Sequence, residues 1–507
     1  MRKQLLLCLV LFSASFGFTQ SNRSSFIKDS LDSYVNTALK EWKIPGVAVA
    51  IIKDNAVLLV KGYGVKEMGT TDKVDENTLF MIGSNTKAFT ATALAILHAE
   101  QKLTLDDKVQ KWLPDFKLFD PWVAKEANIR DLLCHRLGFE TFQGDFMYFD
   151  SDLTTAEVRE KMGKLKPNYG FRSKWGYTNC AFMTAGEIIP KVTGQPWAQY
   201  VTERIFKPLG MNNSLALSKD IKTALNKASA HTVEEGKLKK IPYGNIDNLA
   251  PAGSISSSVA DLSKWVRALL EGGKLDGKEI IPPGAIAQTR LPHSILGNGG
   301  HQFNKAHFSL YGLGWFMEEY AGRKIVAHTG GVNGFFTSVC LVPEERLGII
   351  VFTNTDANNF YEALRNEIED ACLGLPFRNY SKNFLDFQTS SDKETAELVK
   401  KIRDTIAMKP ATALSLRDYA GNYVHDVYGR MNISLESSQL IMRFEHHKGR
   451  LATLSPLGGN RFFSEWNDPI YGKKRLSFTV ENGKVKSLTV RVADFVEFTP
   501  YEFYKTD

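Results

Sequence analysis

The sequence predicts an α+β protein in which a sheet flanked by helices is followed by a smaller all-β domain. Two groups of β-rich segments, near residues 47–63 and 325–352, enclose a long region of mainly helical pattern. Residues 418–507 differ, because short alternating segments there are separated by glycines. Strands at both ends of a unit, with helices between them, indicate a mixed sheet whose first and last strands meet in space.

Length and composition agree with a multi-domain globular protein. The 507 residues allow about three units of roughly 150 residues each, and 43% hydrophobic content excludes a disordered chain. The net charge of +7 is spread along the chain, so no nucleic-acid partner is expected. No Cys-x-x-Cys pair occurs and the adjacent His446 and His447 have no third ligand nearby, so neither a metal nor another cofactor is expected.

The first twenty residues have the pattern of a secretory signal peptide. Arg2 and Lys3 precede an apolar stretch over residues 5–12, and residues 14–20 are small or polar. The apolar stretch is too short to span a bilayer, so we expect a secreted or periplasmic protein without a membrane span, and Cys8 within it is not expected to carry a lipid. The other cysteines are expected as buried free thiols, with one disulfide as the alternative; they are Cys134, Cys180, Cys340 and Cys372.

The elements expected between residues 21 and 375 follow in order. A helix over residues 26–42 precedes a hairpin of Val47–Lys53 and Val57–Tyr63. An Ala- and Leu-rich helix is predicted over Ser84–Gln101. Later helices are predicted over Ala181–Thr193, Trp197–Phe206, Ser258–Leu270 and Asn358–Leu373, and strands over Lys324–Ala327, Ser338–Val342 and Leu347–Phe352. Ser258 and Asp261 are spaced as a variant of the capping box.

The rest of the chain is expected to form a linker and a β domain. Residues 376–413 form the linker, with an amphipathic helix over Glu394–Met408. Residues 414–507 combine aromatic residues in alternating segments with glycines at turns, which is typical of a small sandwich or barrel. The β domain could cap the active-site cleft, bind cell-wall material or form an oligomer, and its residues do not decide among these roles.

The first candidate for chemistry is Ser84, followed by Lys87 three residues later. In a helical first turn the two side chains share one face, so a neutral amine could take the proton of the serine. The N-terminal end of the helix would add free N–H groups for an oxyanion. A capping serine with a solvated lysine is the plain alternative.

Two further segments carry candidate residues. In Trp175-Gly-Tyr-Thr-Asn179, Tyr177 and Asn179 could face one cavity if the segment is extended, as a proton carrier and an amide donor. In His328-Thr329-Gly330-Gly331, which follows a predicted strand, paired glycines allow close approach of a ligand and a free N–H. Taken alone, the first would be a core tyrosine beside a loop asparagine and the second a turn after an edge strand.

The order of these three segments resembles that of the serine β-lactamase and penicillin-binding protein family. The sequence is similar to the class C-like branch, which includes D,D-carboxypeptidases, D-aminopeptidases and esterases. The resemblance extends over residues 27–373 and includes the phrases NIRDLLCHRLG at 128–138, FKPLGM at 206–211, PAGSISSSVADL at 251–262 and HTGGVNGF at 328–335. It implies a β-lactamase/transpeptidase-like fold, and the tail resembles the lipocalin-like domain that follows this unit in some members.

The resemblance also implies a role for each matching position. Ser84 would form an acyl-enzyme, Lys87 would help remove its proton, and Tyr177 would carry that proton to the leaving group. Asn179 would hold the substrate amide, with His328 and Thr329 lining the opposite wall of the cleft. The N–H groups of Ser84 and Gly331 would form the oxyanion hole.

Two departures from the family pattern affect the expected substrate. His328 stands where most β-lactamases have lysine, and histidine is charged only in part near neutral pH. The usual His-Thr-Ser-Gly phrase is here His135-Arg136-Leu137-Gly138, which is expected to reshape the loop beneath the site. We therefore expect an exported serine hydrolase acting on peptide amides, including those with a D-amino acid, or on small esters. A β-lactamase and a penicillin-binding sensor or scaffold that is acylated but not cleared are the alternatives, and the oligomeric state is left open.

Overall fold

The computed structural model describes residues 26–297, 303 and 306–506. The expected signal peptide at residues 1–20 lies outside the described residues. Within them, no helix combines the length and the apolar character needed to cross a membrane. The four described cysteines are free thiols, as expected; Cys134, Cys180 and Cys340 are buried and Cys372 is half-buried.

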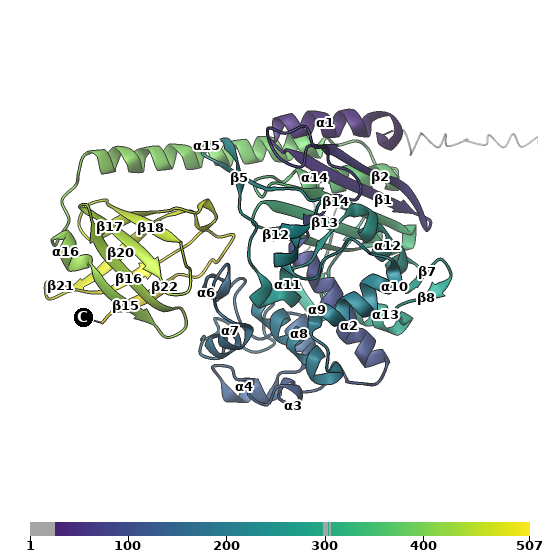
Figure 1. Cartoon of the computed structure of the whole chain (residues 1–507), viewed down its shortest axis with the longest axis horizontal. Helices are drawn as coiled ribbons and strands as arrows, with labels where there is room; N and C mark the ends of the chain where they lie inside the picture. The colour runs from purple at the N-terminus through teal and green to yellow at the C-terminus, as the bar shows by residue number, and fades with distance from the viewer. Residues whose placement is uncertain (1–25, 298–302, 304–305, 507) are drawn as a thin grey trace, which may run out of the picture.

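The larger unit is built on an eight-stranded sheet in the order β2-β1-β14-β13-β12-β11-β10-β9 (Figure 1). Its strands are β1 (Gly46–Lys53), β2 (Ala56–Gly64), β9 (Ser294–Gly297), β10 (Ser309–Tyr311), β11 (Phe316–Tyr320), β12 (Arg323–Val332), β13 (Phe335–Val342) and β14 (Leu347–Thr353). The first strand β1 pairs with the last strand β14. The α+β fold class is confirmed, with one correction: every pairing in this sheet is antiparallel, so the sheet is not mixed. The reason is that β12, β13 and β14 are joined by short hairpins, and β14 returns against β1.

Helices cover both faces of the sheet because its central strands are apolar on both sides. In β1, Val47, Val49 and Ile51 belong to the core that includes helices α1 (Leu31–Glu41) and α14 (Phe360–Leu373). The alternate residues Ala48, Ala50 and Ile52 face the core that includes α2 (Thr86–Ala99) and α12 (Val259–Leu270). Because successive side chains of a strand point to opposite faces of the sheet, β1 contributes to two separate cores. Ser258 caps α12 by accepting from the N–H of Asp261, as its spacing indicates.

The helical region lies between β2 and β9. Its remaining helices are α3 (Val109–Trp112), α4 (Pro121–Glu126), α5 (Ile129–Leu133), α6 (Asp145–Tyr148), α7 (Thr155–Met162), α8 (Asn179–Thr193), α9 (Trp197–Val201), α10 (Lys207–Leu209), α11 (Ala250–Gly253) and α13 (Pro283–Thr289). Three two-stranded sheets accompany them: β3 (Phe80–Met81) with β6 (Ser256–Ser257), β4 (Ala230–Glu234) with β5 (Lys237–Ile241), and β7 (Lys274–Leu275) with β8 (Lys278–Glu279).

The C-terminal unit is a closed eight-stranded antiparallel barrel. Its strands are β15 (Gly421–His425), β16 (Gly429–Glu436), β17 (Gln439–Phe444), β18 (Leu451–Pro456), β19 (Arg461–Trp466), β20 (Lys473–Glu481), β21 (Lys484–Val490) and β22 (Tyr501–Lys505), preceded by α16 (Leu416–Tyr419). Of the two expected architectures, sandwich and barrel, the structure has the barrel. Closure removes the exposed edges that a sheet of short strands would otherwise present.

The two units are joined by the long helix α15 (Tyr380–Ala407), which runs along the top of the view in Figure 1. It starts fourteen residues before the expected helix at Glu394. The early start arises because Tyr380 and Ser381 are buried against the larger unit, which adds packing to a polar sequence. Ion pairs also join the units: Arg450 with Asp150 at 2.6 Å, and Lys473 with Glu235 at 2.7 Å.

Candidate active site

Ser84 lies in a short 3-10 turn, Gly83–Asn85, that leads directly into α2. The α-helix therefore starts at Thr86, two residues after the start we expected. Asn85 holds the turn in place, since its Nδ2 donates to Thr337 Oγ1 of β13 at 2.9 Å. Ser84 itself is only half-buried, so its hydroxyl is accessible at the end of a buried helix.

The turn of Ser84 lies against the backbone of β12, and glycine makes this close approach possible. Gly83 has a φ of +53°, and a Cβ placed on it would lie 2.9 Å from the nitrogen of Gly331. A Cβ on Gly330 would lie 1.9 Å from the carbonyl oxygen of Ile82. Strand β11 pairs with β12 only as far as Ala327, so the backbone of residues 328–332 is left without a partner strand on that side among the described residues. The structure thus brings the amide of Gly331 next to Ser84.

The His-Thr-Gly-Gly segment lies inside β12, whereas the sequence suggested a turn after a strand that ends at Ala327. The correction follows from the pairing of His328 with Val339 and of Gly331 with Phe336 on β13. Thr329 is half-buried and lies on the opposite face of the strand from His328, because side chains alternate along a strand. Of these two expected wall residues, only His328 therefore faces the buried aromatic cluster around Tyr177.

Lys87 is fully buried, and its Nζ has three close oxygen neighbours. They are Ser84 Oγ at 3.1 Å, Asn179 Oδ1 at 2.6 Å and the carbonyl oxygen of Ala252 at 2.8 Å. The amide oxygen and the carbonyl can only accept, so they take two N–H groups of the lysine. The remaining neighbour is the Ser84 hydroxyl, which can donate. In its neutral form the amine therefore directs its lone pair at the proton of Ser84.

Burial supports the neutral form of this lysine. Removal from water holds the pKa of Lys87 well below its usual range, and the nearby Asp145 opposes that shift. The Nζ atom also lies 4.7 Å from the centroid of the Tyr177 ring and 5.6 Å from that of Phe182. A lysine in this environment is suited to act as a general base near neutral pH.

Tyr177 is buried beside the serine and the lysine. Burial raises the pKa of its phenol, the Ser84 hydroxyl lowers it, and Asp145 raises it further. Ser84 is thus near enough to influence the phenol, yet among the described residues the phenol oxygen completes no hydrogen bond. A buried polar atom without a partner is uncommon. Its position suits a proton carrier whose partner is the substrate.

Asn179 is the first residue of α8, so the segment from Tyr177 to Asn179 is not a continuous strand. The two residues still converge, since Asn179 accepts from Lys87 and Tyr177 packs over the same amine. The Nδ2 of Asn179 donates to Asp145 Oδ2 at 2.5 Å. Burial raises the pKa of Asp145 to about 7, against hydrogen bonds from Tyr148 and Asn179 and the charge of Lys87.

Two buried histidines and a tyrosine form a directed network behind Tyr177. The N–H of Thr178 donates to His135 Nδ1 at 3.0 Å, so the proton of that ring is on Nε2. His135 Nε2 lies 3.3 Å from the Tyr311 hydroxyl, which lies 3.2 Å from His328 Nε2. The tyrosine therefore accepts from one histidine and donates to the other, and the ring of His135 packs 4.4 Å from that of Tyr177.

The burial of His328 determines its charge. Burial lowers the pKa of His328 to about 3, and the nearby Lys87 acts in the same direction. The imidazole is thus neutral, whereas the sequence suggested a partial charge near neutral pH. His135, which the altered phrase retains, supplies the packing against the phenol; its ring is buried and its backbone has a φ of +58°.

Sequence reasoning missed Asp145, Tyr311 and the direct role of His135. Asp145 stands in a run of aromatic residues with no recognisable motif, and Tyr311 is a lone aromatic residue on a short strand. The only available signal was that the family phrase containing His135 is altered at Arg136 and Leu137.

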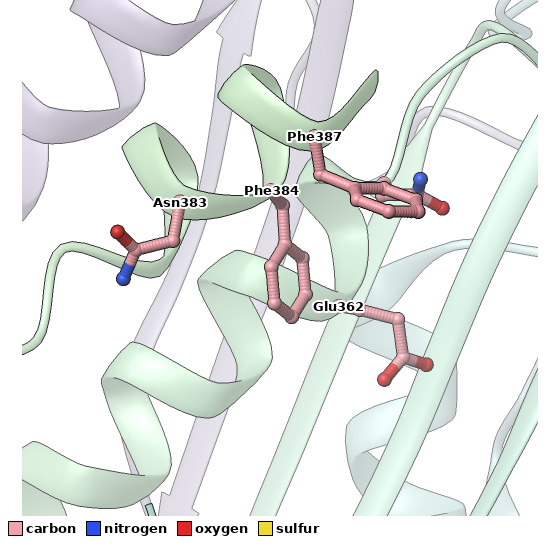
Figure 2. A pocket seen from close by; sticks show the side chains of 5 residues that line it. Glu362, Asn383, Phe384 and Phe387 are labelled. Atoms are coloured by element: carbon pink, nitrogen blue, oxygen red, sulfur yellow. The ribbon is translucent and has the colours of Figure 1, made fainter. Parts of the chain in front are cut away.

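A second pocket lies away from this site. It has a volume of about 550 Å³ between α14 and α15 and is lined by Asn359, Glu362, Asn383, Phe384 and Phe387. Figure 2 shows the phenyl ring of Phe384 and the carboxylate of Glu362 on neighbouring helices. That carboxylate is paired with Arg365 at 3.0 Å, and the lining contains no serine or lysine. The lining therefore lacks the serine and lysine pair found at Ser84 and Lys87.

Comparisons with known protein families divide the chain in the same way as the fold does. The family described as beta-lactamase matches residues 31–371, and a domain of unknown function, DUF3471, matches residues 407–505. Unguisins hydrolase ungD of Aspergillus violaceofuscus is 28% identical over 453 residues, which cover 83% of this chain and 79% of that protein. Protein flp of Staphylococcus aureus is 26% identical over 339 residues, which cover 65% of this chain and 64% of flp.

Two solved structures share the fold. An octameric penicillin-binding protein homologue from Pyrococcus abyssi has a TM-score of 0.59 at 21% identity and covers 94% of this chain and 99% of that one. A D-stereospecific amidohydrolase from Streptomyces sp. has a TM-score of 0.53 at 23% identity and covers 64% of this chain and 94% of that one. At these identities the likeness establishes the fold alone.

Proposed function

Because this chain belongs to the β-lactamase family, we propose that it is a serine hydrolase that forms an acyl-enzyme on Ser84. The observation that carries the proposal is the set of contacts around Lys87 Nζ, where two oxygens accept and the third neighbour is the Ser84 hydroxyl. Members of the family are hydrolases, and a relative that matches most of this chain is named as one.

In the proposed reaction, Lys87 takes the proton of Ser84 while Oγ forms a bond to the substrate carbonyl carbon. The N–H groups of Ser84 and Gly331 stabilise the oxyanion that results. When the intermediate collapses, the bond to the leaving group breaks, Tyr177 passes its proton to that group, and the proton held by Lys87 moves to Tyr177 in its place. Water then attacks the ester with the help of the same groups, which releases the acid and restores Ser84.

The proposed substrates are peptide amides, including those with a D-amino acid, and small esters. The charge of the site supports this choice over a dedicated β-lactamase, because His328 is neutral and does not supply the fixed cation of a lysine at that position. Both ends of the Asn179 side-chain amide are engaged, because its oxygen accepts from Lys87 and its nitrogen donates to Asp145. Asn179 can therefore hold a substrate only if one of these hydrogen bonds opens. We further propose residues 21–375 as the hydrolase domain, 376–413 as the linker and 414–507 as the β domain, with export directed by residues 1–20.

The test is covalent labelling of the purified protein with a serine-reactive fluorophosphonate and with a fluorescent penicillin, read by intact mass. Ser84→Ala should abolish the adduct without changing the thermal unfolding midpoint by more than a few degrees. An undiminished adduct in that variant would refute the assignment. A penicillin adduct that persists for hours points to the sensor or scaffold, whereas steady turnover of a chromogenic cephalosporin points to a β-lactamase.

A further inference from the structure

The mouth of the C-terminal barrel holds a side chain from the larger unit. Phe146 of α6 is fully buried, and its ring lies among the aromatic residues of the barrel. The ring of His447 stacks on it at 4.6 Å and that of Tyr501 at 5.6 Å, and Phe444 meets it edge-on at 5.0 Å. The backbone is held as well, because His447 Nε2 lies 2.8 Å from the carbonyl oxygen of Phe146. Figure 1 shows α6 between the barrel and the rest of the larger unit.

The carboxyl group of a barrel residue, Glu497, contacts the same segment from the other side. Glu497 lies between β21 and β22 and is buried. Its Oε1 accepts from the N–H of Gly144 at 2.9 Å, and its Oε2 accepts from the N–H of Phe146 at 3.0 Å. The hydroxyl of Tyr428 donates to Oε1 at 2.6 Å. These two backbone donors flank Asp145, so the carboxylate fixes the main chain immediately before and after it.

Asp145 lies at the junction between the barrel and the catalytic groups. Its neighbour Phe146 fills the barrel mouth, while its own carboxylate accepts from Asn179 Nδ2. Asn179 in turn accepts from Lys87, whose amine lies next to Ser84. Hydrogen bonds therefore lead from Glu497 to the backbone on either side of Asp145, and from the Asp145 side chain through Asn179 to the amine that faces the nucleophile.

A second contact connects the same barrel loop with Tyr177. The ring of Phe498 stacks on that of Phe142 at 5.6 Å, and Phe142 meets the Tyr177 ring edge-on at 5.6 Å. The N–H of Phe142 also donates to the carbonyl oxygen of Tyr177 at 2.8 Å. The loop therefore touches the supports of both the lysine and the phenol.

We propose that the barrel is a positioning module of the active site, in which Glu497 and the socket around Phe146 hold Asp145 so that Asn179 orients Lys87. Glu497 is a positioning residue, since it acts through the backbone around Asp145 and not on the substrate. The proposal rests on the proposed function of Ser84 and selects a role for the β domain that its sequence left open. It predicts that the barrel affects small and large substrates alike, unlike a cap that restricts substrate size.

The test compares full-length variants with the wild-type protein. Glu497→Gln removes one of the two carboxylate acceptors, and Phe146→Leu shortens the side chain in the socket. The matched control is Asp494→Asn on the same loop, whose carboxylate pairs with Lys474 at the surface and does not touch α6. The measurements are the rate of Ser84 labelling by a fluorophosphonate and the kcat and KM for a small and a large ester.

Misplacement of a catalytic group by about 1 Å can slow a reaction roughly 100-fold. We therefore expect Glu497→Gln and Phe146→Leu to slow labelling roughly 10- to 100-fold and to lower kcat with little change in KM for both esters. Asp494→Asn should match the wild type. Wild-type rates in both α6-contact variants, or a loss confined to the large ester, would overturn the proposal.

Hydrogen–deuterium exchange separates this proposal from the proposed function. In Glu497→Gln the peptide covering residues 142–149 should exchange faster than in the wild type, because the N–H groups of Gly144 and Phe146 lose an acceptor. If Ser84 of the wild type is not labelled, the proposed function fails, and the exchange result alone then decides whether the barrel holds this segment. Unchanged exchange at residues 142–149 would overturn the positioning role in either case.

Discussion

Gly83→Ala tests the contact between the Ser84 turn and β12 most directly. The new Cβ would lie 2.9 Å from the nitrogen of Gly331 and 3.0 Å from its carbonyl oxygen. Because non-bonded heavy atoms prefer separations of roughly 3.5 Å or more, the two backbones must separate by about half an ångström. Alanine at a left-handed φ of +53° costs about 1–2 kcal/mol in addition.

These two effects can be separated with a second glycine. Gly194 ends α8 at a φ of +74°, and a Cβ placed there meets no atom within 4 Å. Gly194→Ala should therefore lower the free energy of unfolding by a similar amount, through the same backbone strain, without displacing the residues of the active site. For each kcal/mol lost, we expect the thermal unfolding midpoint to fall by about 2–4 °C.

The assay is the rate of Ser84 labelling by a fluorophosphonate, measured together with the unfolding midpoint. If the N–H of Gly331 completes the oxyanion hole, Gly83→Ala should slow labelling roughly tenfold or more, since small misplacements of catalytic groups are costly. Gly194→Ala should label at the wild-type rate. Equal rates in the two variants, at similar loss of stability, would refute the reasoning that β12 contributes to the oxyanion hole.

Three further predictions concern the lysine, the histidine network and the buried carboxyl of the barrel. Lys87→Ala and Tyr177→Phe should each slow acylation roughly 10²- to 10⁴-fold in stopped-flow labelling, and a loss below threefold would argue against proton transfer by that residue. Tyr311→Phe leaves two buried imidazole nitrogens without their shared hydroxyl and should lower the free energy of unfolding by about 1–3 kcal/mol in urea, whereas an unchanged midpoint would contradict the network. Burial raises the pKa of Glu497 to about 8, and Asp145 also raises it, while two backbone N–H groups and Tyr428 oppose the shift. When folding raises the pKa of a carboxyl group, the group's contribution to stability is fully present below its unfolded pKa and is lost as the pH rises to its folded pKa. The free energy of unfolding of the wild type, relative to that of Glu497→Gln, should therefore decline between about pH 5 and pH 8. A difference that is constant or rises across this range would show that the carboxyl ionises freely in the folded protein.

The local parts of the site could be predicted from the sequence because they depend on short separations. Ser84 and Lys87 are three residues apart at the start of a helix, so their proximity follows from helix geometry alone. The strands β1 and β14 were predictable from their apolar β-branched residues, and their meeting followed from the layout of the unit. The antiparallel order of the whole sheet could not be predicted from the sequence. Nor could the position of His328 inside β12, since strand pairing can extend past the last strongly β-forming residue when a partner strand continues beside it.

The sequence alone determined several principal helices and strands, among them α2, α12, β1 and β14, the division into a sheet-based unit and a barrel-like unit, and the types of residue that the chemistry requires. Only the tertiary structure decided the protonation and the supports of those residues. The lowered pKa of Lys87 depends on burial, and the contacts of its amine include Asn179 and Ala252, the latter 165 residues away along the chain. The hold on Asp145 depends on Glu497, 353 residues from its partner Gly144. A pKa and a hydrogen-bond partner are properties of the environment that packing creates, so no spacing along the chain encodes them.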